Sequence, residues 1–159
     1  MKLFKNILMI LFISLAFACS KEDEEEILVK EGPFKISELA GNWDATKAQY
    51  SVSSISVDVV ENGGTVTMSV QTNGRFTLTI DPVDRDAYTV SGEMFWEEWQ
   101  QTYHFAIRWD KSSEVYETYG HTYDGGTFSL NGGEGSGEYD FNNDGDFEKC
   151  SVHFFFSRS

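Results

Sequence analysis

The chain has 159 residues, of which 26 are Asp or Glu and 12 are Lys or Arg, so its net charge at neutral pH is −14. Such a charge repels phosphate backbones and argues against nucleic-acid binding, and it also repels anionic lipid headgroups. The length suits one domain with its own hydrophobic core, and the aromatic residues, 15% of the chain, can supply that core.

The first residues are typical of a secretory signal peptide. Lys2 and Lys5 precede an apolar run from Ile7 to Ala18, which matches a basic region, a hydrophobic region and small residues before a cleavage site. The run is too short for a transmembrane helix, which needs about 20 apolar residues. We therefore predict a signal peptide over residues 1–18, and its removal leaves a chain that is more negative by two charges.

Cys19 follows directly after the sequence Leu-Ala-Phe-Ala of residues 15–18. This arrangement resembles the lipobox of bacterial lipoproteins, although a lipobox usually has Leu three places before the cysteine and Leu15 is four places before it. The resemblance implies that Cys19 is acylated and holds the protein at a membrane through its acyl chains, two or more of which anchor stably. The alternative is an ordinary cleaved signal peptide followed by an incidental cysteine.

Residues 20–26, Ser-Lys-Glu-Asp-Glu-Glu-Glu, are a block of mostly negative charge. Such blocks stay solvated, so we predict a disordered acidic tether over residues 19–32 that starts at the acylated cysteine. Cys-Ser-Lys followed by acidic residues also resembles the surface-export signal of some Gram-negative lipoproteins. That resemblance implies an outer-membrane protein displayed at the cell surface, with attachment facing the periplasm as the alternative.

The rest of the chain is expected to form one all-β domain over residues 33–159. A short helical turn from Pro33 to Ala40 is ended by Gly41. Apolar and polar residues then alternate along nine or ten segments, which places them on opposite faces of strands. Asn-Gly and Asp-Gly turns between the segments favour hairpins, so the pattern predicts an antiparallel sandwich or barrel.

Gly41-Asn-Trp43, which follows the helical turn and opens the first strand, resembles the start of a lipocalin-like domain. More specifically, it is similar to the small lipocalin-like lipoproteins of Gram-negative bacteria. The resemblance implies an antiparallel up-and-down β-barrel of about eight strands, with Trp43 plugging its closed end. It also implies a basic residue packed across this tryptophan, for which Arg158 and Arg108 are the candidates. The Thr-Asp-Tyr element of true lipocalins is absent.

A barrel of this size can hold one small ligand. We therefore expect a small apolar or amphipathic ligand in the barrel mouth. Its contacts are expected to come from some of six inward positions: Val66, Met68, Phe76, Leu78, Phe105 and Ile107. The alternative is a barrel filled by its own large aromatic side chains, whose loops contact a protein or glycan partner. No nucleophile, cofactor or phosphate-loop motif stands out, so we do not expect an enzyme.

The segment from residue 140 to 148 is the best candidate for a metal site. Asp140, Asn142, Asp144 and Asp146 place oxygen atoms at alternate positions, with glycine at the sixth, as in the first half of a calcium loop. The twelfth position is Ser151 rather than Glu, and a strand-like segment follows, so this is not an EF-hand. It is either a partial calcium loop or a polar β-turn, and we favour the turn.

Three further features have structural interpretations. The aromatic and acidic residues of 95–99 could hold a sugar ring, but Trp96 and Trp99 would lie on opposite faces of a strand, so core packing is expected. The histidines are too widely spaced in the chain to suggest a metal site. If Cys19 is acylated, Cys150 is the only other thiol, and its apolar surroundings predict a small buried residue.

Overall fold

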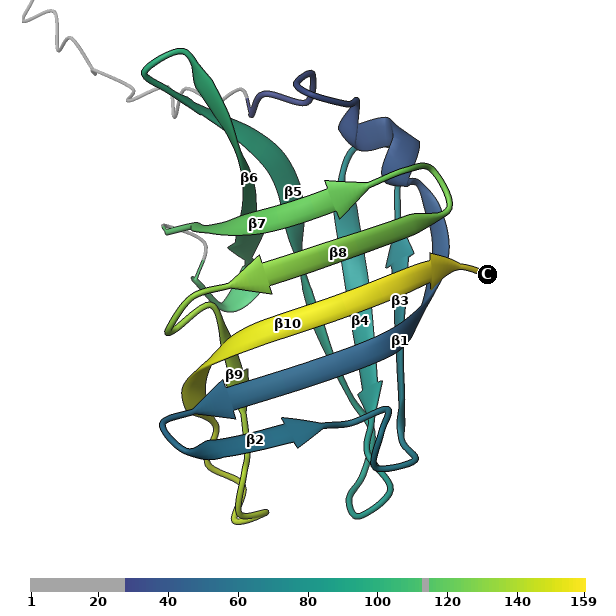
Figure 1. The fold of residues 1–159 in the computed structure, drawn as a ribbon, viewed down its shortest axis with the longest axis vertical. Coiled ribbons are helices and arrows are strands. Elements are labelled where there is room, and N and C mark those ends of the chain that lie inside the picture. Colours follow the sequence, from purple (N-terminus) through teal and green to yellow (C-terminus); the bar gives the residue numbers. More distant parts are fainter. Residues whose placement is uncertain (1–27, 113–114) are drawn as a thin grey trace, which may run out of the picture.

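The computed structural model describes residues 28–112 and 115–159 (Figure 1). The described residues form ten strands and two short 3₁₀ helices. In chain order these are η1 (Ile36–Leu39), β1 (Gly41–Val52), β2 (Ile55–Asp58), β3 (Thr65–Val70), β4 (Arg75–Asp81), β5 (Tyr88–Trp99), β6 (Thr102–Trp109), η2 (Asp110–Ser112), β7 (Glu117–Tyr123), β8 (Thr127–Gly132), β9 (Gly137–Tyr139) and β10 (Glu148–Arg158).

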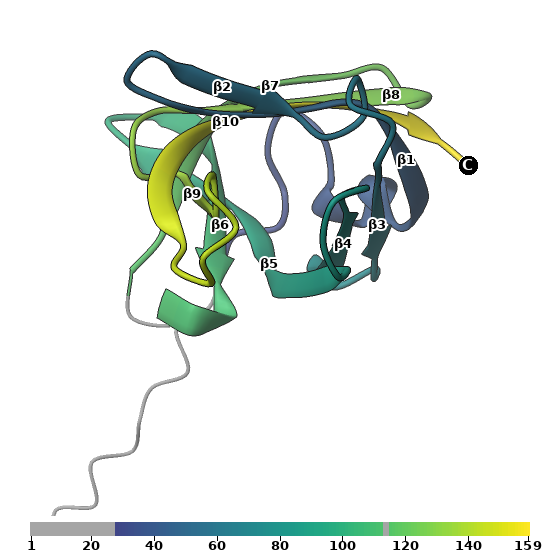
Figure 2. The same cartoon turned by 90° about the horizontal axis from the view of Figure 1, so that it is seen from below.

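The strands form a closed antiparallel barrel, seen end-on in Figure 2. Eight of them follow one another around the ring in the order β1-β3-β4-β5-β6-β7-β8-β10, and β1 pairs with β10 to close it. The two short strands β2 and β9 pair with the ends of β1 and β10. The predicted all-β, up-and-down barrel of about eight strands is therefore confirmed.

The alternating sequence pattern explains why the sheet closes. In β3, Val66, Met68 and Val70 are buried while the threonine and serine residues between them are exposed. A sheet with one apolar face buries it completely when its first and last strands pair, and closure also removes the free edges. Pairing of β1 with β10 runs from Trp43 opposite Arg158 to Ser51 opposite Ser151.

One end of the barrel is closed by η1 and Trp43. Trp43 is fully buried, and its indole N–H donates to the carbonyl of Leu39 at 2.8 Å. The Arg158 guanidinium lies over the indole, with Cζ 4.2 Å from the ring centroid. The predicted helical turn and the predicted contact between Trp43 and a basic residue are both present, and Arg158 rather than Arg108 makes that contact.

Residues 28–32 are held against the barrel, although they were expected to be part of the disordered tether. The backbone N–H of Trp96 donates to the Val29 carbonyl at 2.8 Å, and the Lys30 ammonium forms a 2.6 Å ion pair with Glu93. The free edge of β5 supplies backbone partners for this segment, because β4 pairs with β5 only as far as Glu93. Residues 1–27, including Cys19 and the predicted signal peptide, lie outside the described residues.

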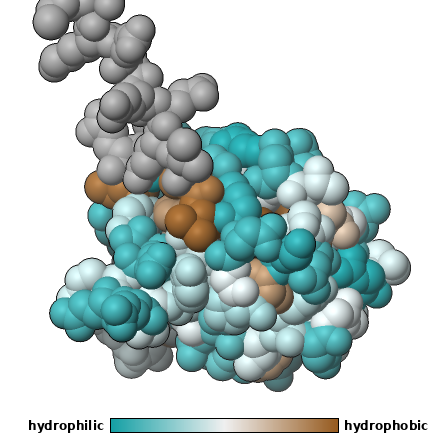
Figure 3. All heavy atoms as spheres, turned by 90° about the horizontal axis from the view of Figure 1, so that it is seen from above, coloured by the Kyte–Doolittle hydropathy of each residue, from teal (hydrophilic) through white to brown (hydrophobic). Residues whose placement is uncertain are grey.

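The face of the molecule around the closed end is shown in Figure 3. It is largely hydrophilic, with hydrophobic residues in a few small patches. None of the helices in the described residues is long and apolar enough to cross a membrane.

Candidate functional site

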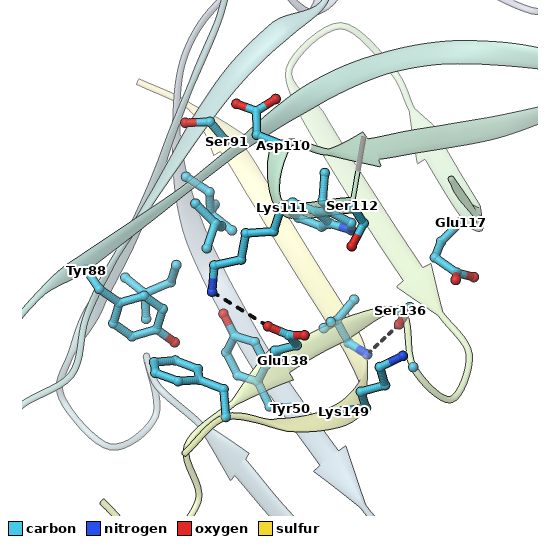
Figure 4. Close-up of a pocket in the computed structure, with 18 of the residues that line it drawn as sticks. Tyr50, Tyr88, Ser91, Asp110, Lys111, Ser112, Glu117, Ser136, Glu138 and Lys149 are labelled. Atoms are coloured by element: carbon cyan, nitrogen blue, oxygen red, sulfur yellow. Dashed lines mark hydrogen bonds and ion pairs between the residues drawn. The ribbon is translucent and has the colours of Figure 1, made fainter. Parts of the chain in front are cut away.

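A cavity of about 480 Å³ lies at the end of the barrel opposite Trp43 (Figure 4). The strands β5, β7 and β10 begin at this end and β6 ends there, so residues at strand termini and in the adjoining loops surround it. The lining residues are Tyr50, Leu78, Ile80, Tyr88, Thr89, Val90, Ser91, Trp109, Asp110, Lys111, Ser112, Val115, Glu117, Gly135, Ser136, Gly137, Glu138, Phe147, Lys149, Val152 and Phe154.

The floor of the cavity is apolar. Leu78 and Ile80 on β4 and Phe154 on β10 are all buried, because alternate residues of these strands face the barrel interior. Trp109 closes one side and packs edge-on against Phe76, with ring centroids 5.4 Å apart. A mostly apolar, concave surface with a few polar groups is the usual form of a small-molecule site.

Two tyrosines provide polar atoms inside the cavity. Tyr50 is nearly fully buried and stacks on Tyr139 at 4.5 Å. The Tyr88 hydroxyl is buried and lies close enough to the Tyr50 hydroxyl for a hydrogen-bond interaction that shifts both pKa values, but no hydrogen bond of normal length and angle joins it to a described residue. Burial raises the pKa of both phenols well above the ordinary value, so both remain protonated at physiological pH.

Charged side chains form the rim. The Lys111 ammonium lies 3.7 Å from a carboxylate oxygen of Glu138 and 5.4 Å from the Phe147 ring centroid. Asp110 is held on the outside by a bidentate pair with Arg75, at 2.8 and 2.9 Å. Glu117 and Lys149 complete the charged lining. The rim therefore offers both signs of charge around an apolar floor.

A hydrogen-bond chain fixes the loop between β8 and β9 against the cavity. The Trp109 indole N–H donates to the Tyr119 hydroxyl at 3.0 Å, and that hydroxyl donates to the Ser136 carbonyl at 2.5 Å. The Ser136 hydroxyl in turn accepts from the Val152 N–H at 3.3 Å. Ser136 is only 2% exposed, so this part of the cavity wall is built by paired polar groups and is largely preformed.

The six residues from which the ligand contacts were predicted to come are all buried in the barrel core, with exposed fractions of at most 4%. Only Leu78 reaches the cavity. Val66, Met68, Phe76, Phe105 and Ile107 lie deeper or on other parts of the interior and pack against each other and the closed end. Toward the Trp43 end the barrel is filled by buried side chains, and the cavity lies at the opposite end.

Four site residues were not predicted from the sequence: Tyr88, Trp109, Lys111 and Glu138. They lie at strand ends and in separate connections, so no local spacing brings them together. The alternation of Tyr103, Phe105, Ile107 and Trp109 did place Trp109 on the inward face at the end of a strand. The inward position of Trp109 at the end of a strand was the one feature of the sequence that could have pointed to a residue lining the cavity.

The loop from Asp140 to Asp146 is organised by its own hydrogen bonds. The Asp140 carboxylate accepts the backbone N–H groups of Asp144 and Gly145, at 3.2 and 2.9 Å. Burial raises the pKa of Asp140, but these N–H donors outweigh it and hold the pKa below its usual value. Asn142 donates to Asp144 at 2.9 Å. These contacts have the form of a polar turn, which was favoured over a calcium loop from the sequence.

Arg85, in the connection between β4 and β5, anchors this loop. Its guanidinium donates to the Asp140 carbonyl and lies 5.3 Å from the Tyr139 ring centroid. The oxygen atoms of Asp140 are therefore already committed to backbone donors and to a nearby guanidinium. Among the described residues, no group of three or more His, Cys, Asp or Glu side chains is arranged to hold a metal ion.

The other motifs have structural roles in the described residues. Trp96 is buried and its indole N–H donates to the Phe34 carbonyl, while Trp99 is 62% exposed at the tip of the β5–β6 hairpin. The two tryptophans do lie on opposite faces. Cys150 is buried, and burial raises the pKa of its thiol to about 12, so it is not an activated nucleophile.

Comparisons with known protein families, curated proteins and solved structures found no match to this chain.

Proposed function

We propose that this chain is a lipid-anchored protein of the cell envelope that binds a small amphipathic ligand in the mouth of a lipocalin-like barrel. The observation that carries the proposal is the cavity of about 480 Å³ at the open end, with an apolar floor and polar rim. The fold supports it because an eight-stranded barrel of this kind has room for one small ligand at its mouth. The proposed role is binding rather than catalysis.

Native mass spectrometry of the protein purified from its own cells tests ligand binding. Residues 28–159 include the closed barrel and its core, so a form lacking residues 1–19 keeps every described contact and avoids the acyl chains. We expect an organic adduct whose mass identifies the ligand. A bare mass for protein that retains its β-sheet circular dichroism would contradict the proposal.

A cavity-filling variant locates the adduct. Val90 lies in the cavity wall, and Val90→Trp should fill part of the space and abolish the adduct. Val83 is 72% exposed and does not line the cavity, so Val83→Trp is the matched control and should keep the adduct. An adduct that survives Val90→Trp would place the ligand elsewhere.

Attachment to a membrane is proposed from Cys19 and the residues around it. The test is metabolic labelling with an alkyne-bearing palmitate analogue in a Gram-negative host that processes lipoproteins. Cys19→Ser should lose the label, whereas Cys150→Ala should keep it, because Cys150 is buried in the barrel. Label retained by Cys19→Ser would exclude this anchor. Protease accessibility on intact cells then distinguishes surface display, which we propose, from a periplasm-facing position.

A second candidate function is that of an interaction protein whose barrel has no ligand. Two observations favour it. The barrel is filled by side chains toward the Trp43 end, and Trp99 is exposed at a hairpin tip, which suits contact with a protein or glycan partner. Binding of the barrel to a panel of surface glycans, compared between the natural chain and Trp99→Ala, would test it. Loss of glycan binding in the variant would support this candidate.

A further inference from the structure

The polar groups inside the cavity indicate what kind of ligand it takes. The Tyr88 hydroxyl is buried in the cavity wall and makes no hydrogen bond of normal geometry within the described residues. Buried polar atoms in folded proteins nearly always have a partner, and a hydroxyl without one is unfavourable. A hydroxyl in the wall of a cavity finds that partner when a bound molecule offers a polar atom.

Hydrogen-bond donors gather at this point. The Tyr50 hydroxyl lies beside that of Tyr88, and both phenols stay protonated because burial raises their pKa. Figure 4 shows the Lys111 side chain extending across the cavity above Tyr50 toward Glu138. Its ammonium is 3.7 Å from the Glu138 carboxylate, which is longer than a hydrogen bond. The two phenol hydroxyls and the ammonium therefore lie near one another at the cavity wall, with the Lys111 side chain 70% exposed.

The carboxylates near these donors do not satisfy them. Asp110 is held by both terminal nitrogens of Arg75. Glu138 is 44% exposed and keeps the 3.7 Å separation from Lys111, and no hydrogen bond joins it to either tyrosine. Tyrosine hydroxyls and an ammonium that surround one space are the donor set that receives a carboxylate.

The shape of the cavity restricts the rest of the ligand. Leu78, Ile80 and Phe154 close the floor, and below them Met68, Phe76 and Phe105 fill the barrel. These buried side chains occupy the space that a long acyl chain would need. The walls include the aromatic rings of Trp109 and Phe147, which favour a compact and flat apolar body.

We propose that the cavity selects a compact aromatic monocarboxylate, whose carboxylate accepts hydrogen bonds from Tyr50 and Tyr88 and pairs with Lys111 while its ring system lies against Trp109. This inference rests on the proposed ligand-binding function and adds the chemical class of the ligand.

Calorimetric titration with three compounds that share one body tests the class. The probes are 2-naphthylacetate, 2-naphthaleneethanol and 2-naphthylethylammonium, titrated into protein freed of adducts. We expect the carboxylate to bind at least tenfold more tightly than the other two. Equal or tighter binding of the alcohol or the ammonium would overturn the proposed class while leaving ligand binding intact. No binding by any probe, in a protein that carries an adduct when purified from its own cells, would likewise overturn only the class.

Two variants separate head-group recognition from a structural role. Tyr88→Phe should weaken carboxylate binding by roughly tenfold, as expected for a lost hydrogen bond to a charged group, without lowering the melting temperature of the ligand-free protein, because it removes an unpaired hydroxyl. Lys111→Met should remove the preference for carboxylate over alcohol and leave alcohol binding unchanged. If both variants bind the carboxylate as the natural chain does, the proposed contacts are wrong.

Matched controls use the same changes away from the cavity. Tyr103 is 39% exposed on β6, and Lys35 is exposed beside η1 at the closed end; neither lines the cavity. Tyr103→Phe and Lys35→Met should leave the affinity for all three compounds unchanged. A tenfold loss in either control would show that the effect of the test variants is not local, and would contradict the assignment.

Discussion

Arg158 and Trp43 are directly opposite each other on β10 and β1, and the guanidinium of the first covers the indole of the second at 4.2 Å. The same guanidinium donates to the carbonyls of Glu38, Ala40 and Gly125, at 2.8 to 3.0 Å. One side chain thus joins the end of the last strand to η1, to the start of the first strand and to the β7–β8 turn. The barrel is closed at this end by a cation–π contact and three hydrogen bonds.

Replacement of Arg158 should destabilise the protein. Arg158→Leu removes the cation–π contact and leaves three carbonyls to water, so we expect a loss of about 2 kcal/mol in the free energy of unfolding. Arg158→Lys keeps the charge but lacks the planar guanidinium fork, so its free energy of unfolding should lie between those of the natural chain and Arg158→Leu. Urea unfolding measures both. Arg75→Leu, which removes an exposed ion pair on β4, is the control and should cost less than about 1 kcal/mol.

Phe105 should behave as a core residue and not as a contact of the ligand. It is fully buried among aromatic rings, so Phe105→Ala should lower the free energy of unfolding by about 3–5 kcal/mol. Phe155 is 41% exposed on the outer face of β10, and Phe155→Ala should cost far less. Equal costs from the two variants in urea unfolding would contradict the packing described here.

His121 should make stability depend on pH. Its ring packs against Phe34, Trp96 and Phe105, and burial lowers its pKa. As the pH falls, His121 of the unfolded chain is protonated near pH 6.5, whereas His121 of the folded chain is protonated only at a lower pH. The free energy of unfolding falls as the pH drops below about 6.5 and levels off once the pH is below the folded pKa.

The variant His121→Phe removes this contribution, so its unfolding midpoint in urea should change less between pH 7 and pH 5 than that of the natural chain. His153→Phe is the control, because His153 lies on β10 outside the buried aromatic cluster. Identical pH dependence in the natural chain and His121→Phe would show that His121 is not responsible.

Cys150 should be unreactive in the folded protein. Burial raises its pKa to about 12, and only the thiolate attacks electrophiles. In a Cys19→Ser background, maleimide labelling at neutral pH should be slow and should accelerate as urea unfolds the barrel. Rapid labelling without denaturant would mean that β10 opens locally near Cys150.

The loop from Asp140 to Asp146 should not need calcium. Its carboxylate at Asp140 is already bound by backbone donors, so a chelator should leave the melting temperature unchanged, and added Ca²⁺ should not raise it. Asp140→Asn weakens those contacts and should lower the melting temperature with or without Ca²⁺. A rise in the melting temperature on addition of Ca²⁺ that Asp144→Ala abolishes would instead establish the calcium loop.

The sequence by itself determined an antiparallel all-β fold whose strands each bury one face, while the resemblance of Gly41-Asn-Trp43 to a lipocalin-like start implied the barrel. Alternation such as that of Val66, Met68 and Val70 depends only on neighbours two residues apart, and the strand geometry turns it directly into a buried and an exposed face. The start of the first strand at Gly41 and the burial of Trp43 were also readable, because the helical turn and the glycine signal them locally.

Tertiary structure alone decided where space remains inside the barrel. Some of six inward residues were expected to line a ligand site; all six are packed in the core, and Leu78 is the one among them that borders the cavity. The two-residue period of a strand shows which side chains point inward. Whether a cavity remains depends on how far side chains from opposite strands fill the space between them. Tyr88 begins β5, Lys111 lies in η2 and Glu138 lies in β9, and these three elements meet only in the folded barrel, so no local pattern in the sequence could have joined them.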